Sequence, residues 1–450
     1  MIDPRADYWD PTIETIGRDE LATVQLHKLQ WQVQRCWDSS AFYRERLEAA
    51  GVAPSDIQSL DDVRRIPIVT KQELRDEQLA HPPYGRYAVG VQANWRELHP
   101  STGTTGVPVS TIWSEADCEN ITQFTARTMW SFGVRPGDIV QNAFSYGLWV
   151  AGMSVHYAAK RIGCFVIPIG AALTNRQIDY LLAGSTVLLA TPSYALHIAE
   201  ALRERGINPD ATALAMGCFG GEAGTENHST RGKIERGLGI DAYDYYGLAE
   251  IGPTFASECV AKAGIHWAED HHLIEIINPD SMEPCAEGEI GVVVITHLSR
   301  EATPMLRYWT NDYARYTSQL CACGRTHGRS VGGIMGRHDD LVIYRGAKFY
   351  PVQVEKVVRS FVELSDEFRI ELTRDEHVGT DRCTVVAEIN DGADEAVLGR
   401  LRSALREELL VTPEIRLEHF GTLERTTFKA QRILDLRPKE EATSPNEGRR

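Results

Sequence analysis

Between about residue 95 and residue 300, short apolar segments with the length of buried strands alternate with longer segments of helical character. The clearest strand candidates are residues 138–143, 164–169, 187–190 and 214–220. This alternation is typical of βαβ units, in which parallel strands are buried beneath helices. The sequence therefore predicts an α/β fold built on a largely parallel sheet.

Two further regions flank the predicted parallel sheet. Residues 288–291 form a predicted turn that leads into a strand at 292–296, so a β-rich section should follow the α/β part. Nearer the N-terminus, Leu29, Val33 and Cys36 are spaced by four and three residues, which places them on one face of a helix. We expect the first 95 residues to form helices packed on the surface of the domain.

Residues 61–71 look like connective structure. A helix should stop near Pro67, because proline cannot continue it, and a second helix should start with Thr70 as its N-cap. No chemistry is expected from this segment.

The pattern starts again near residue 340, in the order strand, helix, strand, helix, strand. Strands are predicted at residues 341–344, 384–389 and 415–417, and helices over residues 354–361 and 398–409. This order suggests a compact α+β domain of roughly 110 residues.

The chain has 450 residues, which is too long for a single core of ordinary size. We place a large N-terminal domain at residues 1–338 and a small, mobile C-terminal domain at residues 339–438. Residues 439–450 are charged and have no apolar period, so we expect a disordered tail.

The composition excludes several classes of function. With 47 Lys+Arg against 63 Asp+Glu the formal net charge is -16, so a sequence-independent nucleic acid binder is not expected. There is no run of about 18 apolar residues, and the N-terminus lacks a secretory signal, so we expect a cytoplasmic enzyme without a membrane partner. The nine cysteines are mostly scattered singly, which fits a reducing compartment.

The strongest local motif is the loop Ser101-Thr102-Gly103-Thr104-Thr105-Gly106-Val107-Pro108. Hydroxyl residues alternating with glycines can turn backbone N–H groups and side-chain donors toward phosphate oxygens. By composition alone, a plain turn is the alternative. The loop is not a Walker motif, since the Gly-Lys-Ser/Thr ending is missing.

Further motifs follow this loop at residues 243–250, 307–312, 336–340 and 428–432. Together with the loop they resemble the adenylate-forming superfamily of acyl-CoA ligases, luciferases and peptide-synthetase adenylation domains. The segments that resemble its phenylacetate-CoA ligase branch in particular are residues 42–43, 60–62, 141–148 and 266–271. The resemblance covers nearly the whole chain.

The resemblance implies a site for ATP and Mg²⁺. Tyr246 would stack on adenine, Asp244 would accept from the adenine amine, Asp312 would bind the ribose, and Glu250 would hold Mg²⁺. The full set implied for ATP is Ser101, Thr102, Gly103, Thr104, Thr105, Gly106, Asp244, Tyr245, Tyr246, Gly247, Asp312 and Arg337.

Three residues are implied to be catalytic: Lys429, Glu250 and Thr104. Lys429 would bridge the attacking carboxylate and the α-phosphate and stabilise the charge that develops between them, although a lone lysine in such a segment is usually a solvated charge. Asp339 matches the family's hinge, about which the small domain swings between adenylation and thioester formation; an ordinary turn residue is the alternative.

The chain departs from the family pattern at the phosphate loop. In relatives the loop usually ends in Gly-Lys-Pro, whereas here it ends in Gly106-Val107-Pro108, so one positive charge near the phosphates is missing. The family's histidine just upstream is retained as His99. Lys348 also replaces a residue that is commonly neutral, and we expect it to be solvated rather than bound to the acceptor's phosphates.

Cys321 and Cys323 form a compact chelating turn that needs two more ligands for a tetrahedral metal site. Cys259 and His266 are the proposed other half, which would make a closed structural Zn²⁺ site, as some members of the resembled branch carry. Reduced cysteines packed in the core, or a redox pair, are the alternatives. His327 is a lower-ranked substitute ligand.

The resemblance also implies where the organic acid binds. Aromatic walls, with glycines that admit a flat ring, suggest an aryl or arylacetic acid, while plain core packing is the alternative. The candidate pocket residues are Phe144, Tyr146, Gly147, Trp149, Gly220, Gly221, Glu222 and Tyr245.

The function implied is activation of an aromatic acid by ATP as acyl-AMP, followed by thioester formation with coenzyme A. The first alternative keeps adenylation and changes the partner, either to a carrier-protein thiol or to nitrite for the diazotisation of an aryl amine. A non-enzymatic, zinc-stabilised binding module is the alternative from another class; Glu250, Asp312 and Lys429 together argue against it. The sequence leaves the oligomeric state open, with a homodimer as the candidate assembly.

Overall fold

A computed structural model of the chain describes residues 7–101, 107–148, 150–345, 347–374, 381–390, 393, 396–425 and 432–437. The described residues form two compact units. The first comprises those up to Asp339, and the second those from Asp340 onward.

The first unit begins with a helical region. Its elements are α1 (Pro11–Glu14), α2 (Arg18–Ser39), α3 (Ala41–Ala49), η1 (Pro54–Asp56), η2 (Leu60–Arg65), α4 (Lys71–Ala80) and η3 (Gln92–Asn94). The predicted helix face is confirmed in α2, where Leu29, Val33 and Cys36 are fully buried. Thr70 is the N-cap of α4, as predicted, and it shares a capping box with Glu73.

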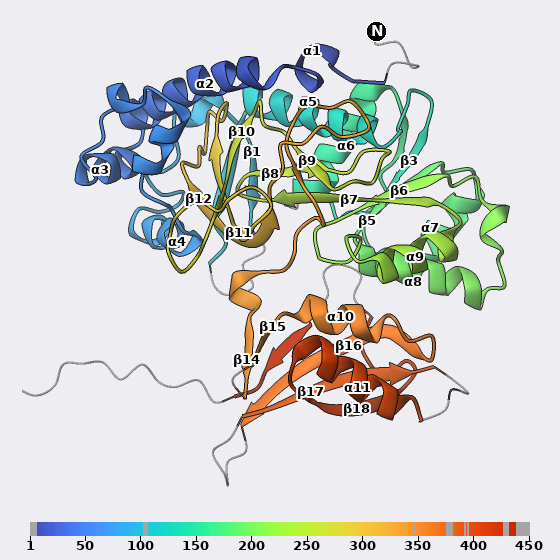
Figure 1. The fold of residues 1–450 in the computed structure, drawn as a ribbon. Coiled ribbons are helices and arrows are strands. Elements are labelled where there is room, and N and C mark those ends of the chain that lie inside the picture. The colour runs from blue at the N-terminus through green and yellow to red at the C-terminus, as the bar shows by residue number, and fades with distance from the viewer. Residues whose placement is uncertain are drawn as a thin grey trace, which may run out of the picture. The chain divides into compact units, whose positions relative to one another are not determined.

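An eight-stranded sheet, ordered β13-β9-β8-β7-β6-β5-β3-β4, forms the centre of the first unit (Figure 1). Its strands are β3 (Ile139–Asn142), β4 (Phe165–Ile167), β5 (Val187–Ala190), β6 (Met216–Phe219), β7 (Asp241–Leu248), β8 (Gly252–Ser257), β9 (Ile265–Trp267) and β13 (Arg329–Ser330). Pairing is parallel from β4 to β7 and antiparallel from β7 to β13. The predicted parallel sheet is therefore confirmed, including all four of its clearest strands.

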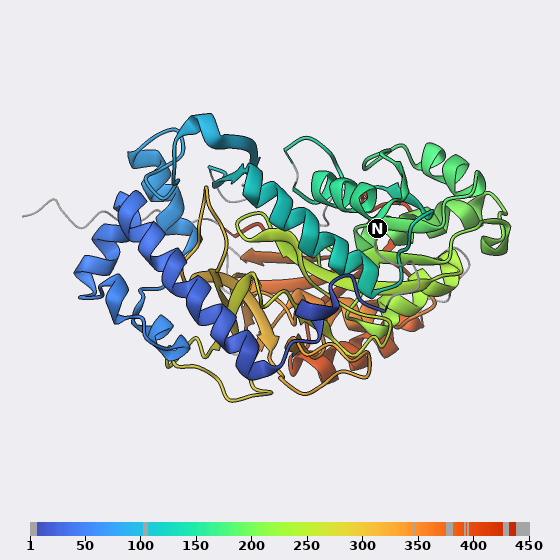
Figure 2. The ribbon, with the colours of Figure 1, turned by 90° about the horizontal axis from the view of Figure 1, so that it is seen from above.

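Helices cover both faces of the parallel strands. On one face lie α5 (Glu115–Ser131) and α6 (Val150–Ile162); on the other lie α7 (Thr174–Leu182), α8 (Pro192–Glu204) and α9 (His228–Leu238). Adjacent residues of β5 show why the strand is apolar throughout: Leu189 packs with the α5 and α6 side, and Leu188 with the α7 to α9 side. Seen from above, α2 and α5 both extend across the sheets (Figure 2).

The β-rich section is also confirmed. Strands β10 (His272–Ile277), β11 (Ile290–His297) and β12 (Tyr308–Arg315) form an antiparallel sheet. A separate antiparallel hairpin consists of β1 (Trp95–Pro100) and β2 (Ser110–Ser114). The ends of the segment predicted to bind phosphate, Ser101 and Pro108, lie between these two strands in the chain.

The second unit follows the short helix η5 (His338–Asp340). Its elements are β14 (Val342–Tyr344), β15 (Ala347–Phe349), α10 (Pro351–Val358), β16 (Leu364–Arg374), β17 (Asp381–Ile389), α11 (Val397–Leu409), β18 (Glu414–His419) and β19 (Ile433–Asp435). A four-stranded sheet, ordered β18-β17-β16-β19, packs against the two α-helices.

The sequence analysis missed β16, the longest strand of the second unit. Its apolar residues Phe368, Ile370 and Leu372 alternate with charged ones, so only one face is buried. Within the described residues, no helix has the length and apolar character needed to cross a bilayer.

Candidate active site

The phosphate-loop candidate is closed at its base by Ser101. The Ser101 backbone N–H donates to the Val109 carbonyl at 2.9 Å, and the Val109 N–H donates to Ser101 Oγ at 3.0 Å. The structure therefore holds the two ends of the loop together. The predicted residues that lie outside the described residues are Thr102, Gly103, Thr104, Thr105, Gly106, Trp149 and Lys429.

Helix α4 holds the C-terminal end of this loop. Arg75 Nε donates to the Val107 carbonyl at 3.1 Å, and Gln78 Nε2 donates to the Pro108 carbonyl at 3.1 Å. Val107 is the position where related loops carry lysine, so a guanidinium from another element lies next to the position of the missing charge.

The same helix begins with a residue that the sequence analysis overlooked. Lys71 Nζ lies 2.9 Å from Glu250 Oε1, and the Glu250 carboxylate is almost fully buried. Because Lys71, Arg75 and Gln78 follow at i, i+4 and i+7, they share one face of α4. Nothing in the local sequence indicated that this face would meet Glu250.

A second group of contacts surrounds Asp312 at the edge of the β10–β12 sheet. The Tyr246 hydroxyl donates to Asp312 Oδ2 at 2.5 Å, and Arg337 Nη1 donates to Asp312 Oδ1 at 3.0 Å. Arg337 also contacts the Asp339 carboxylate, at 2.9 Å from Nε and 2.8 Å from Nη2. The structure thus brings Tyr246, Asp312 and Arg337 together, as expected for residues of one binding site.

Asp244 lies in a separate acidic cluster. Burial, followed by the charges of Glu226 and Glu258, raises the pKa of Asp244 well above its usual range. Glu258 is itself held by Arg231 Nη2, at 2.9 Å from both of its oxygens, and it accepts from the Asp244 backbone N–H at 2.9 Å. The surroundings of Asp244 thus favour its protonated form over the carboxylate.

Gly247 has a structural reason to be glycine. A Cβ at this position would lie 1.8 Å from the Pro253 carbonyl oxygen, because β7 and β8 approach each other there. Gly247 therefore allows the tight turn that leads from Tyr246 to Glu250.

Two aromatic side chains meet near the carboxyl ends of the parallel strands. The rings of Phe144 and Tyr245 contact edge to face, with centroids 5.8 Å apart at 85°. A Cβ at Gly220 would lie 2.8 Å from Tyr245 Cε1, so glycine is required where the tyrosine ring packs. Parallel α/β sheets commonly bind ligands at this end of the strands.

Tyr146 belongs to a polar network beside these rings. Its hydroxyl accepts from Asn142 Nδ2 at 2.7 Å and lies 3.1 Å from His156 Nδ1. Burial raises the pKa of Tyr146 to about 12. The sequence analysis missed Asn142 and His156 as residues that orient this side chain.

The remaining described pocket candidates are Gly147, Gly221 and Glu222. Gly147 and Gly221 are exposed and have positive φ angles of 82° and 86°. Glu222 Oε1 accepts from the Ser193 backbone N–H at 2.8 Å, at the start of α8. The Glu222 carboxylate therefore satisfies a helix N-terminus.

The four predicted metal ligands converge from three segments. The ligand atoms of Cys259, His266, Cys321 and Cys323 all lie within 4.8 Å of one another. Cys259 Sγ is 3.8 Å from Cys321 Sγ, and Cys323 Sγ is 3.5 Å from His266 Nε2. Zn–S bonds of about 2.3 Å and Zn–N bonds of about 2.0 Å at tetrahedral angles would separate ligand atoms by about 3.5–3.8 Å. The side chains therefore fit a tetrahedral ion.

His327, the substitute ligand, is not a member of this cluster. Its Nδ1 lies 3.0 Å from the Trp267 carbonyl oxygen. Its own carbonyl oxygen lies 3.3 Å from His266 Nδ1, which leaves His266 Nε2 facing the thiols. His327 thus orients the ligand histidine.

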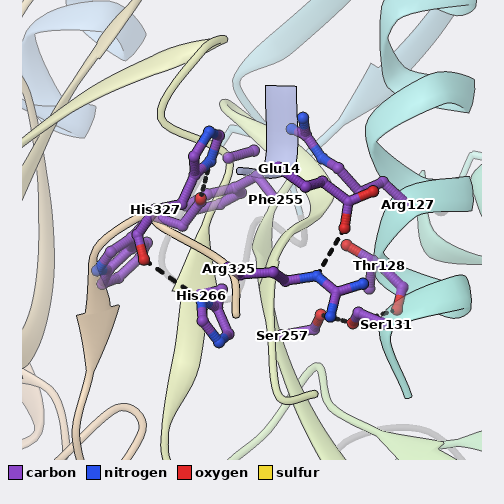
Figure 3. Close-up of a pocket in the computed structure, with 11 residues that line it drawn as sticks. Glu14, Arg127, Thr128, Ser131, Phe255, Ser257, His266, Arg325 and His327 are labelled. Atoms are coloured by element: carbon purple, nitrogen blue, oxygen red, sulfur yellow. Dashed lines mark hydrogen bonds and ion pairs between the residues drawn. The ribbon is translucent and has the colours of Figure 1, made fainter. Parts of the chain in front are cut away.

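The N-terminal segment contacts the Cys321–Cys323 turn and the residues that follow it; Figure 3 shows the Glu14 side chain directed at Arg325. Arg325 Nε donates to Glu14 Oε2 at 2.6 Å, and both side chains are buried. The Tyr8 hydroxyl donates to the Cys323 carbonyl at 3.0 Å, and the Thr326 N–H donates to the Glu14 carbonyl at 3.0 Å. The sequence alone did not indicate that α1 would hold the chelating turn.

Comparison with known proteins identifies the fold. Residues 346–437 match the family described as the AMP-binding enzyme C-terminal domain. The structure of 2-hydroxyisobutyryl-CoA ligase in the postadenylation state, in complex with R3-HIB-AMP, superimposes with a TM-score of 0.89 at 30% identity, over 97% of this chain and 95% of that one. The fold is that of an adenylate-forming enzyme.

Whole-chain similarity narrows this class. The chain is 37% identical to phenylacetate-coenzyme A ligase of Thermus thermophilus, over 95% of this chain and 99% of the relative. It is 35% identical to phenylacetate-coenzyme A ligase of Pseudomonas putida, over 95% of this chain and 97% of the relative. The chain belongs to the phenylacetate-CoA ligase family, whose members are AMP-forming acid–thiol ligases. The predicted resemblance is confirmed.

Proposed function

We propose that this enzyme converts an aromatic carboxylic acid, ATP and coenzyme A into an acyl-CoA thioester, AMP and pyrophosphate. The acid's carboxylate attacks the α-phosphate and pyrophosphate leaves; the thiol then attacks the acyl carbon and AMP leaves. The observation that carries this proposal is the 37% identity to a phenylacetate-coenzyme A ligase over 95% of the chain. The edge-to-face pair of Phe144 and Tyr245 supports an aromatic acid.

The nucleotide is proposed to bind between the loop that follows Ser101 and the cluster around Asp312. Tyr246 and Arg337 hold both Asp312 oxygens, which fixes the carboxylate that would accept from the ribose hydroxyls. Asp244, whose pKa is raised by burial and by its acidic neighbours, would contact the adenine amine. Thr104 and Thr105 of the loop remain the proposed phosphate ligands.

Phosphate charge is proposed to be balanced by α4 and by Mg²⁺. Glu250 would hold the ion, which neutralises phosphate oxygens when it is bound. Lys71 lies beside that carboxylate, and Arg75 is anchored at Val107. These two cations would compensate for the lysine that the loop lacks. Lys429 is proposed to stabilise the charge that develops as the acid attacks.

The large and small domains are proposed to divide these roles, with Asp339 as the hinge between the two poses. In support, the first compact unit ends at Asp339, and Arg337 and Asn311 both contact the Asp339 carboxylate. The proposed tail at residues 439–450 lies outside the described residues.

Zn²⁺ is proposed to occupy the Cys259, His266, Cys321 and Cys323 cluster as a structural ion. Three thiolates and one imidazole would fill all four positions of a tetrahedral site and leave none for water. The ligand separations of 3.5 and 3.8 Å support this assignment. Elemental analysis of purified protein should find about one zinc ion per chain.

The experiment that tests the function is incubation with ATP, Mg²⁺ and a panel of aryl and arylacetic acids, with and without coenzyme A. We expect acid-dependent AMP release and a thioester only when coenzyme A is present. Nitrite with an aryl amine is the control for the diazotisation chemistry. AMP release that depends on nitrite, with no thioester from any acid, would refute the proposal.

A further inference from the structure

Tyr245 carries a buried hydroxyl that finds no hydrogen-bond partner among the described residues, although its side chain is only 5% exposed. Burial, followed by the nearby Cys218 and Asp244, raises the pKa of Tyr245 well above its usual range, so the group keeps its proton. A hydroxyl removed from water without a new partner is destabilising, and buried polar groups are therefore nearly always paired.

The other tyrosine of the proposed acid pocket is different. The Tyr146 hydroxyl contacts both Asn142 Nδ2 and His156 Nδ1, so side chains of the protein satisfy it. It needs nothing from a ligand. Of the two phenols, only Tyr245 retains its full capacity to donate and to accept.

The surroundings of Tyr245 connect it to the ligand end of the sheet. Its ring packs against Gly220, which directly follows β6, and against Phe144, which follows β3. Both positions lie at the carboxyl ends of parallel strands, where ligands enter α/β folds. The phenol is therefore a buried polar group on a ring that packs against Phe144 and Gly220 at the ligand end of the sheet.

We propose that the Tyr245 hydroxyl binds a hydrogen-bonding substituent on the ring of the acid, so that the preferred substrate is a ring-hydroxylated aryl or arylacetic acid. This inference rests on the proposed function. A ring hydroxyl can both donate to and accept from the phenol. A site built around such a bond discriminates against the analogue that lacks it, because its own buried group is then left unpaired.

The test compares kcat/KM for phenylacetate, benzoate and their 2-, 3- and 4-hydroxy derivatives, using AMP release by the full-length enzyme. The variant is Tyr245→Phe, which removes one oxygen and keeps the ring. Tyr243→Phe is the matched control, because Tyr243 lies two residues earlier on the same face of β7 and packs on Phe132.

We expect the wild-type enzyme to prefer at least one hydroxylated acid over its parent by about tenfold. Tyr245→Phe should bring the ratio of kcat/KM between the hydroxylated acid and its parent down to about one, while Tyr243→Phe should retain the wild-type ratio. Equal effects of Tyr245→Phe on all acids, or no preference in the wild-type enzyme, would overturn the inference. A wild-type enzyme that activates none of these acids would instead overturn the proposed function, and this inference with it.

Discussion

The Cys/His cluster and the proposed acid pocket lie in the same unit, yet they differ in whether their polar groups have partners within the protein. In the cluster, the ligand atoms of Cys259, His266, Cys321 and Cys323 face one another. In the pocket, the Tyr245 hydroxyl is buried without a partner among the described residues. The cluster needs only an ion to complete it, as expected of a structural site. The pocket leaves a polar group for the substrate to satisfy.

The largest expected effect tests the cluster. Cys321→Ser should lose zinc and destabilise the first unit by about 5 kcal/mol or more, because a structural ion contributes its binding free energy to folding. Zinc content and urea unfolding measure the two effects. Cys118→Ser, at a half-buried cysteine outside the cluster, is the control and should retain the metal. Equal zinc content in both variants would contradict the assignment of the ligands.

The enclosure of the cluster can be tested through Glu14→Gln. This change removes the carboxylate that is paired with the buried Arg325 guanidinium, which should cost about 3 kcal/mol and speed zinc release to a chelator. Glu119→Gln removes one partner of the exposed Arg161–Glu119 pair and should cost less than about 1 kcal/mol. If the two variants unfold alike, Glu14 does not hold the chelating turn.

Lys429→Ala should reduce catalysis without changing metal binding. We expect AMP formation to fall about 10²-fold or more, because the lysine acts on charge that develops in the transition state. Zinc content and urea unfolding should stay at the wild-type values. A loss of AMP formation smaller than about threefold would show that Lys429 is not the catalytic lysine.

The smallest expected effect concerns α4. Lys71→Met should lower kcat/KM for ATP by about tenfold, because it removes a positive charge beside Glu250 where the phosphate loop has none. Lys356→Met, at an exposed pair with Glu408 in the second unit, should leave ATP use unchanged. If Lys71→Met leaves kcat/KM for ATP unchanged, then Lys71 does not balance the phosphate charge, and Arg75 and Mg²⁺ would do so alone.

Much of the fold could be predicted from local patterns, and the exceptions have a physical cause. Residues 187–190 were predicted as a strand, and β5 has those bounds, because a strand buried on both faces is apolar at every position. Strand β16 was missed, since only alternate residues such as Phe368 and Ile370 are buried. The metal ligands were predicted because Cys321 and Cys323 are neighbours in the chain.

The contacts that lie between distant segments were not predicted. Lys71 and Glu250 are about 180 residues apart, and neither residue type nor spacing indicates that a helix start would meet the turn after β7. The Arg325 pair with Glu14 is of the same kind. Such contacts depend on how α4 and α1 pack, which periodicity does not encode.

The sequence by itself determined the βαβ alternation, the adenylate-forming motifs and the residue types of the cluster, because each of these depends only on residues that are close together in the chain. Only the tertiary structure decided which groups are satisfied and which are not. Tyr146 and Tyr245 are the same residue type in one proposed pocket, yet packing pairs the first hydroxyl with Asn142 and leaves the second without a partner among the described residues. Hydrogen-bond satisfaction depends on donor–acceptor distances of about 3 Å, and those distances are set by the packed core.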